Sequence, residues 1–207
     1  DGIPDECDAD TPSSILIDTF ADFGDPELGL SYLWSSDLDL QNLSEMTFFD
    51  NHQGEGRVCY SPNFESGCFI TPDEAATNEG QACTRAQFGL QIPVLEYSYK
   101  AQGATNASIS LNLYKECNNC LSGCPGITPV RIRLSHSAEV LFEQTDFAFD
   151  STYNFDVVLE PGSMVRLAVF PEDGCYCDTT QYRLVIRDAL QENDCNNNGI
   201  LDSCELD

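Results

Sequence analysis

The stretch Ser108-Ile109-Ser110-Leu111-Asn112-Leu113 alternates strictly between polar and apolar side chains. Successive side chains of a β-strand point to opposite faces, so the stretch predicts a strand with one buried and one solvated face. The same alternation recurs at residues 130–135, 165–169 and 182–187. Most of these segments have one solvent-exposed face, which is typical of strands in antiparallel sheets. Together they predict a sandwich of such sheets.

Shorter strand candidates precede this region, at residues 14–20, 30–34, 46–49, 58–59 and 95–100. The segment Glu160-Pro161-Gly162-Ser163 has the Pro and Gly of a type II turn and predicts a hairpin of strands 153–159 and 164–170. Short helical turns are expected at 72–76 and 37–43. The fold class that follows is all-β: an antiparallel, jelly-roll-like β-sandwich of roughly eight to ten strands, with disulfide-rich loops.

The end of the chain matches a twelve-residue calcium loop of the EF-hand type. Oxygen-bearing side chains occupy loop positions 1, 3, 5, 9 and 12, Gly199 occupies the sharp turn at position 6, and position 7 supplies a backbone carbonyl. A hard cation is bound by oxygen donors, which this loop supplies at alternating positions. The predicted calcium ligands are Asp194, Asn196, Asn198, Ile200, Asp202 and Glu205.

The beginning of the chain repeats the second half of this loop. Residues 1–10 align without gaps on residues 198–207, and Asp1, Asp5 and Asp8 retain oxygen ligands at the matching positions. The predicted organisation is therefore a half calcium repeat at 1–10, a β-sandwich domain at 11–190 and a calcium repeat at 191–207. Either the chain is one period of a tandem array, or separate subunits meet end to end.

Eleven cysteines favour a secreted protein, because disulfides persist in oxidising compartments. Cys195 and Cys204 lie within the terminal loop, where a disulfide between them would staple it. Eight cysteines lie in the central domain, and zinc binding by 117–124 with 175–177 is a less favoured alternative to disulfides. Cys7 is left over. It matches Cys204, whose partner would precede residue 1, so Cys7 is a candidate for a disulfide between units.

The charge of the chain excludes some partners. Nine basic and 35 acidic residues among 207 give a net charge of −26, which disfavours nucleic acids and anionic membranes. Hydrophobic residues make up 42%, enough for a folded core, and no apolar run is long enough to span a bilayer. The sequence has neither an initiator Met nor a signal peptide, which indicates a processed or excerpted chain.

Residues 87–188 resemble secreted bacterial β-sandwich modules of the pre-peptidase C-terminal and carbohydrate-binding types. The resemblance rests on the Leu-Asn-Leu-Tyr strand, the Pro-Gly turn and the final Tyr-Arg-Leu-Val-Ile strand. The terminal loops resemble dockerin and thrombospondin type 3 calcium repeats. The split loop without helical partners is closer to the calcium repeats that link extracellular domains.

Catalytic motifs are weak in this sequence. Neither His52 nor His136 lies in a hydrolase motif, and His136 is expected to be a satisfied surface residue. Asp37 and Asp39 would share a face on a strand and could in principle support glycoside hydrolysis. In a chain this acidic, however, a solvated face explains such a pair better, and the chain is expected not to be an enzyme.

Aromatic pairs at alternating positions, Tyr32 with Trp34 and Tyr97 with Tyr99, are candidates for a sugar platform. Such pairs are more often part of a sandwich core. Asn42 and Asn106 begin Asn-x-Ser sequons and are candidate N-glycosylation sites.

The complementary ends favour a structural function: an extracellular protomer or repeat that assembles head to tail into a fibre or surface layer through calcium-bound termini. Its partner would be another copy of the chain, and its cofactor would be calcium. The alternative is a carbohydrate- or protein-binding module of a larger secreted adhesin or hydrolase. That alternative predicts an exposed aromatic strip that includes Trp34.

Overall fold

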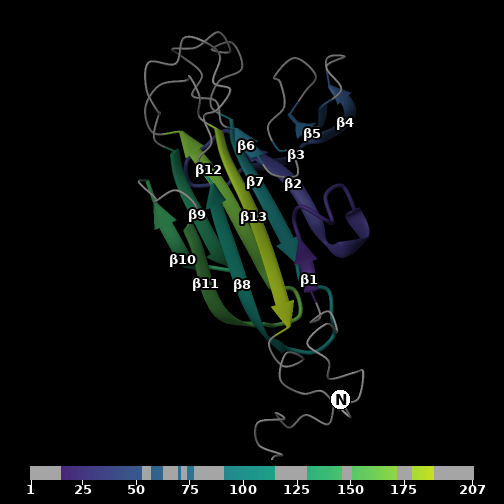
Figure 1. The fold of residues 1–207 in the computed structure, drawn as a ribbon, viewed down its shortest axis with the longest axis vertical. Coiled ribbons are helices and arrows are strands. Elements are labelled where there is room, and N and C mark those ends of the chain that lie inside the picture. The colour runs from purple at the N-terminus through teal and green to yellow at the C-terminus, as the bar shows by residue number, and fades with distance from the viewer. Residues whose placement is uncertain are drawn as a thin grey trace, which may run out of the picture.

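The protein forms two antiparallel β-sheets that pack face to face (Figure 1). The computed structural model describes residues 15–52, 57–62, 70, 74–76, 91–114, 130–145, 151–171 and 179–188. Within these ranges the secondary structure consists of thirteen strands and one short 3-10 helix. These elements are β1 (Ile15–Asp18), η2 (Pro26–Leu28), β2 (Leu30–Ser35), β3 (Leu43–Glu45), β4 (Thr47–His52), β5 (Arg57–Ser61), β6 (Glu74–Ala76), β7 (Ile92–Ser98), β8 (Thr105–Tyr114), β9 (Val130–His136), β10 (Glu139–Gln144), β11 (Ser151–Leu159), β12 (Met164–Pro171) and β13 (Thr179–Asp188).

The first sheet, called sheet A here, has the order β1-β13-β8-β11, and β6 also pairs with β13. Strand β8 is central, because Leu111 lies opposite Leu184 of β13 on one side and Tyr153 of β11 on the other. Strands β1 and β6 share the other edge of β13, where Ile15 lies opposite Arg187 and Ala76 lies opposite Thr179. The alternating stretch 108–113 therefore lies in the interior of sheet A.

The second sheet, sheet B, has the order β10-β9-β12-β7-β2-β3. Strand β12 lies between β9 and β7, with Leu167 opposite Leu134 and Leu95. Strands β4 and β5 form a separate two-stranded hairpin. No helix among the described residues is long and apolar enough to cross a membrane.

The core lies between sheets A and B and is built from the apolar positions of the alternating strands. On β8, Ile109, Leu111 and Leu113 are fully buried, while their polar neighbours face outward. Each such side chain contributes about 1.5–3 kcal/mol on burial, so the alternation of the sequence determines which face of the strand turns inward. The predicted all-β, antiparallel sandwich is confirmed.

The turn at Glu160–Ser163 was predicted correctly, but the hairpin around it is wrong. Gly162 has a φ of 84°, and the Ser163 N–H donates to the Glu160 carbonyl at 2.8 Å. The strands on either side nevertheless belong to opposite sheets, since β11 pairs with β8 and β12 pairs with β7 and β9. The turn crosses the sandwich and is fixed to Tyr99, which accepts from Gly162 N and donates to Ser163 O.

The two segments expected to form helical turns contain no helix among the described residues, although Leu40 N donates to the Asp37 carbonyl in a single turn. Within 72–76 the structure describes 74–76, which form β6. Between β2 and β3 the Asp37 carboxylate accepts the backbone N–H groups of Gln41 and Asn42, at 2.9 and 3.1 Å. Because this side chain satisfies backbone donors, the segment is a capped loop instead of a helix. The single short helix among the described residues, η2, begins after Asp25, whose carboxylate accepts from Glu27 N.

Candidate functional site

The predicted calcium and cysteine sites lie outside the described residues. These residues are Asp1, Asp5, Cys7, Asp8, Asp194, Cys195, Asn196, Asn198, Ile200, Asp202, Cys204 and Glu205. Among the described residues, no group of three or more His, Cys, Asp or Glu side chains could hold a metal ion. Cys59 is the single cysteine in the described ranges, and it is fully buried and disulfide-bonded.

The two sequons occupy exposed positions. Asn42 lies in the loop before β3, where its Nδ2 donates to Asp37 Oδ2 at 3.0 Å. Asn106 lies on the outward side of β8, near the start of the strand. Both asparagines remain candidates for N-glycosylation.

The aromatic pairs belong to the core, so the exposed strip predicted by the binding alternative is not formed through Trp34. Tyr32 and Tyr97 are each 5% exposed, and the partly buried Trp34 packs on the same core. Tyr32 stacks on Tyr60, with ring centroids 3.8 Å apart, and its hydroxyl accepts from Gly24 N. Burial raises the pKa of Tyr32 to about 12. The core role predicted for these aromatic pairs is therefore confirmed.

Two other polar candidates differ from their expected settings. Asp37 and Asp39 lie in the loop after β2 and not on a strand. His136 ends β9, and its Nε2 is buried without a hydrogen-bond partner, so it is not the satisfied surface residue that was expected.

The outward side of sheet A carries a group of polar side chains, which we call the polar platform; Val158 of β11 and the buried Val185 of β13 interrupt it. It comprises Ser108, Ser110, Asn112 and Tyr114 on β8, Thr152, Asn154 and Asp156 on β11, and Gln181, Arg183 and Arg187 on β13. These side chains form rows across the strands: Arg183, Asn112 and Thr152 lie opposite one another, as do Arg187, Ser108 and Asp156. The alternation that buries apolar side chains in the core thus leaves mostly polar side chains on the other side of the sheet.

Two hydroxyl–amide hydrogen bonds order the middle of the polar platform. The Thr152 hydroxyl donates to Asn112 Oδ1 at 2.6 Å, and the Ser110 hydroxyl donates to Asn154 Oδ1 at 2.7 Å. The amide oxygens are therefore used within the protein, while neither Nδ2 group donates to a described residue. Each amide has two N–H donors at that nitrogen, so both asparagines present fixed donors to solvent.

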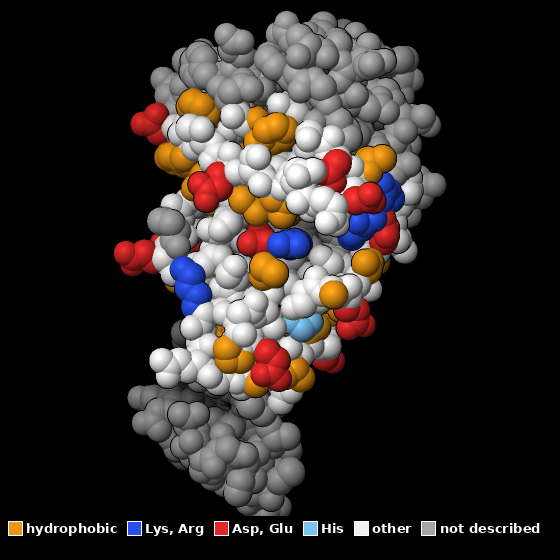
Figure 2. Space-filling view, turned by 180° about the vertical axis from the view of Figure 1, so that it is seen from behind, with side chains coloured by type: hydrophobic (Ala, Val, Ile, Leu, Met, Phe, Trp, Pro, Cys, Tyr) orange, Lys and Arg blue, Asp and Glu red, His pale blue; other side chains and the backbone are white. Residues whose placement is uncertain are grey.

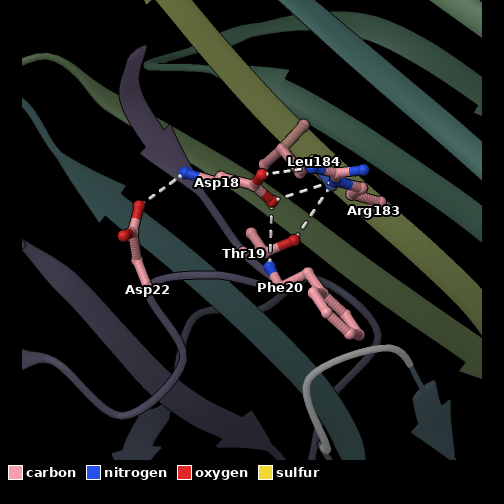
Figure 3. Close-up of polar contacts among 6 residues, drawn as sticks. All are labelled: Asp18, Thr19, Phe20, Asp22, Arg183 and Leu184. Carbon is pink, nitrogen blue, oxygen red and sulfur yellow. Dashed lines mark hydrogen bonds and ion pairs between the residues drawn. The ribbon is translucent and has the colours of Figure 1, made fainter.

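Arg183 adds a third donor group and is itself held in place by Asp18 (Figure 3). The Arg183 Nε and Nη2 groups donate to the two carboxylate oxygens of Asp18, a bidentate arrangement that fixes the guanidinium plane. Asp18 is 7% exposed and the Arg183 side chain is 49% exposed, so the pair is buried on one side only. Hydrogen bonding by Arg183 lowers the pKa of Asp18, and the same contact raises the pKa of Arg183.

Backbone contacts around Asp18 anchor this pair. The Asp18 N–H donates to Asp22 Oδ2 at 2.7 Å, and Phe20 N donates to Asp18 Oδ1 at 3.1 Å. Thr19 and Leu184 exchange two bonds, Thr19 N to the Leu184 carbonyl and Leu184 N to Thr19 Oγ1, both at 3.0 Å. The turn after β1 is thereby locked onto β13, and it holds Arg183 at the margin of the polar platform.

The opposite face of the molecule, the outward side of sheet B, has a different character (Figure 2). Its basic side chains are paired with acidic ones: Arg166 with Glu96, and both Arg131 and Arg133 with Glu143. Arg131 and Arg133 also lie over the ring of Phe170, at 4.2 and 4.9 Å from its centroid. Phe170 belongs to a buried apolar cluster with Ile92, Val94 and Ala168, against which Leu33, Leu40 and Leu43 pack.

Comparisons with known proteins give no family. No protein-family model matches the sequence, and no curated protein matches it. Among solved structures, the chain is similar to a family 35 carbohydrate binding module from an environmental isolate, with 17% identity, a TM-score of 0.30, and coverage of 46% of this chain and 69% of that one.

Two further similar structures are CBM51 from Clostridium perfringens GH95 in complex with methyl-galactose and the K1 cleaved adhesin domain of Lys-gingipain from Porphyromonas gingivalis W83. Both have 10% identity and a TM-score of 0.36; they cover 75% and 76% of this chain, and 99% and 90% of their own chains. The chain spans only 19% of the length of a Podospora anserina GH26-CBM35 mannanase that it also resembles. These identities and TM-scores are low, so the likeness assigns neither a family nor a ligand.

Proposed function

We propose that this chain is a non-catalytic, extracellular binding module that recognises carbohydrate through the polar platform of sheet A. The observation that carries the proposal is the pair of asparagine amides whose oxygens are engaged by neighbouring hydroxyls. The unused N–H groups of Asn112 and Asn154, with the Arg183 guanidinium beside them, suit the hydroxyl and carboxylate oxygens of sugars.

The spacing of the platform supports an extended glycan as ligand. Arg183, Asn112 and Thr152 lie on three adjacent strands, which places the outer two about 10 Å apart. A row of this length contacts more than one sugar ring. Tyr114, 38% exposed and near Arg183, offers an aromatic surface at one end of the platform.

A variant series on a glycan array tests this proposal. The array should span neutral and uronate-containing polysaccharides, with affinities of the bound glycans then measured by calorimetry. We expect Asn112→Ala to weaken binding about tenfold, the effect of losing one or two hydrogen bonds of about 1 kcal/mol each. Thr152→Val preserves the shape of the side chain but releases the Asn112 amide, and it should weaken binding in the same direction.

The matched control is Thr47→Val, an exposed threonine on β4 outside the polar platform. It should leave glycan affinity unchanged. A chain that binds no glycan of the array at millimolar concentration contradicts the proposal, as does equal binding by the three variants.

The repeated termini favour a second function, which we also propose. Residues 194–207 hold a complete calcium loop by sequence, and residues 1–10 repeat its second half. In this proposal calcium-bound termini join successive units head to tail, Cys195–Cys204 stiffens the loop, and the sandwich is the repeating body. The two proposals are compatible, because the polar platform lies on strands of the sandwich.

A further inference from the structure

Strand β11 is an edge strand of unusual length and regularity for this protein. It pairs with β8 over nine consecutive residues without a register shift, and no described strand pairs with its other side. The other edge strands of the two sheets are interrupted or short: β1 and β10 contain register shifts, and β3 and β6 have three residues each. Bulges and shortness protect a sheet edge from pairing with another chain, and β11 has neither protection.

The inward side of β11 is incompletely covered. Tyr153, Phe155 and Val157 pack against the core but remain partly exposed, whereas the inward residues of β8 beside them are fully buried. Phe142 of β10 lies against Tyr153 and Phe155, at ring distances of 4.3 and 6.3 Å, and forms the other wall of this edge. A further strand beside β11 would complete the burial of these rings.

We propose that a second copy of this chain supplies that strand, by antiparallel pairing of β11 with β11 about a two-fold axis through Phe155. A self-paired strand must keep apolar side chains opposite apolar ones, which excludes every register that shifts the partner by an odd number of residues. An axis at Asp156 would place two carboxylates directly opposite each other. The axis at Phe155 avoids this and uses all nine residues.

In that register the two faces of the paired strands are each complementary. On the inward face Phe155 lies opposite its copy, and Tyr153 lies opposite Val157; such aromatic and β-branched pairs stabilise antiparallel strands. On the outward face Asp156, the single charged residue of β11, lies opposite Asn154. Local repulsion across the joint is therefore small, although the net charge of each chain is −26.

The contact is isologous and closes as a dimer, so it differs from the head-to-tail joint of the termini. The pairing also brings the β10 strands of the two copies toward each other. Val140, which is 51% exposed, lies on this strand. The contact also continues sheet A across both copies, which places two polar platforms on one face.

Introducing charges at one outward pair of the proposed joint tests the proposal. Thr152 and the 49% exposed Val158 lie at opposite ends of β11 and face each other across the proposed joint. The double variant Thr152→Lys/Val158→Lys places lysine opposite lysine twice per dimer. The variant Thr152→Lys/Val158→Glu places lysine opposite glutamate and should permit the dimer again.

Sedimentation equilibrium of residues 1–207 in EGTA measures the dimer constant without calcium-dependent contacts. We expect a wild-type dimer, at least tenfold weaker association of the lysine–lysine variant, and recovery in the lysine–glutamate variant. Circular dichroism and thermal unfolding of all three proteins check that the exposed substitutions preserve the fold.

A wild-type chain that stays monomeric up to about 1 mM overturns the proposal. So does a dimer that survives the lysine–lysine substitution or that the lysine–glutamate pair fails to restore, since either result places the contact elsewhere.

Discussion

At the scale of single residues, the Asp18–Arg183 pair illustrates how distant positions become one unit. The two residues are 165 positions apart in the sequence, and neither lies in a motif. Their bidentate contact fixes an arginine that the polar platform needs, and at the same time it holds β1 against β13 (Figure 3). The pair therefore serves both stability and the proposed binding face.

We predict that Asp18→Asn lowers the free energy of unfolding by about 2 kcal/mol at neutral pH, because the charged hydrogen bonds to Arg183 are lost. The pKa of Asp18 is lowered in the folded protein by its hydrogen bonds to Arg183. Its stabilisation is thus present above the ordinary value of 3.8 and is lost as the pH falls through the folded-state pKa. Denaturant unfolding between neutral pH and about pH 3 measures both effects.

The wild-type protein should accordingly lose more stability on acidification than the Asp18→Asn variant does. Asp39→Asn is the control, because Asp39 is exposed in the loop after β2. Parallel pH profiles for the wild-type protein and Asp18→Asn would contradict the assignment of this stabilising role to the pair.

At the scale of elements, tight turns decide which strands become neighbours. Gly29 ends η2 with a φ of 87° and leads into β2, and a Cβ atom there would lie 2.5 Å from the Ser98 carbonyl oxygen. Gly162, in the turn between β11 and β12, has a similar φ of 84°, but a Cβ atom there would have no neighbour within 4 Å. Substitution of the two glycines therefore distinguishes two effects. Both positions have a left-handed backbone, but only Gly29 lies close to another backbone atom.

We predict that Gly29→Ala destabilises the protein more than Gly162→Ala. The second substitution carries only the cost of a left-handed conformation, about 1–2 kcal/mol. The first adds a clash with the backbone of Ser98, whose N–H donates to the Gly29 carbonyl, so at least 1 kcal/mol more should be lost. Thermal or denaturant unfolding of the two variants measures the difference, and equal losses would show that the contact at Ser98 relaxes freely.

At the scale of the whole molecule, the two proposed contacts between copies have different requirements. The β11 contact uses backbone groups and apolar side chains and should not depend on calcium. The head-to-tail contact depends on ion ligands at the termini, which lie outside the described residues.

We therefore predict that calcium lengthens the assemblies and that EGTA returns them to short species. Electron microscopy with calcium and after chelation measures this, and Asp194→Ala, which removes the first ligand of the predicted loop, should reproduce the effect of EGTA. Asp39→Asn serves again as the control. Particles of one size in both conditions would contradict the head-to-tail proposal and leave the binding module as the better account.

The sequence by itself determined the fold class and the faces of the strands. Alternation at 108–113 shows which side of β8 turns inward, because burial of apolar surface depends on side-chain period and not on the identity of the neighbouring strand. The same local rule located the turn at Glu160–Ser163. The calcium-loop prediction has the same local origin.

The tertiary structure alone decided the pairing of the strands and the candidate site. The turn at Gly162 is compatible with a hairpin or with a crossing between sheets, and the contacts with Tyr99 select the crossing. Likewise, Asn112 receives its orienting hydroxyl from Thr152, 40 residues away, and Arg183 receives its carboxylate from Asp18. Local periodicity carries no information on such partners, since they are set by the cooperative packing of distant strands.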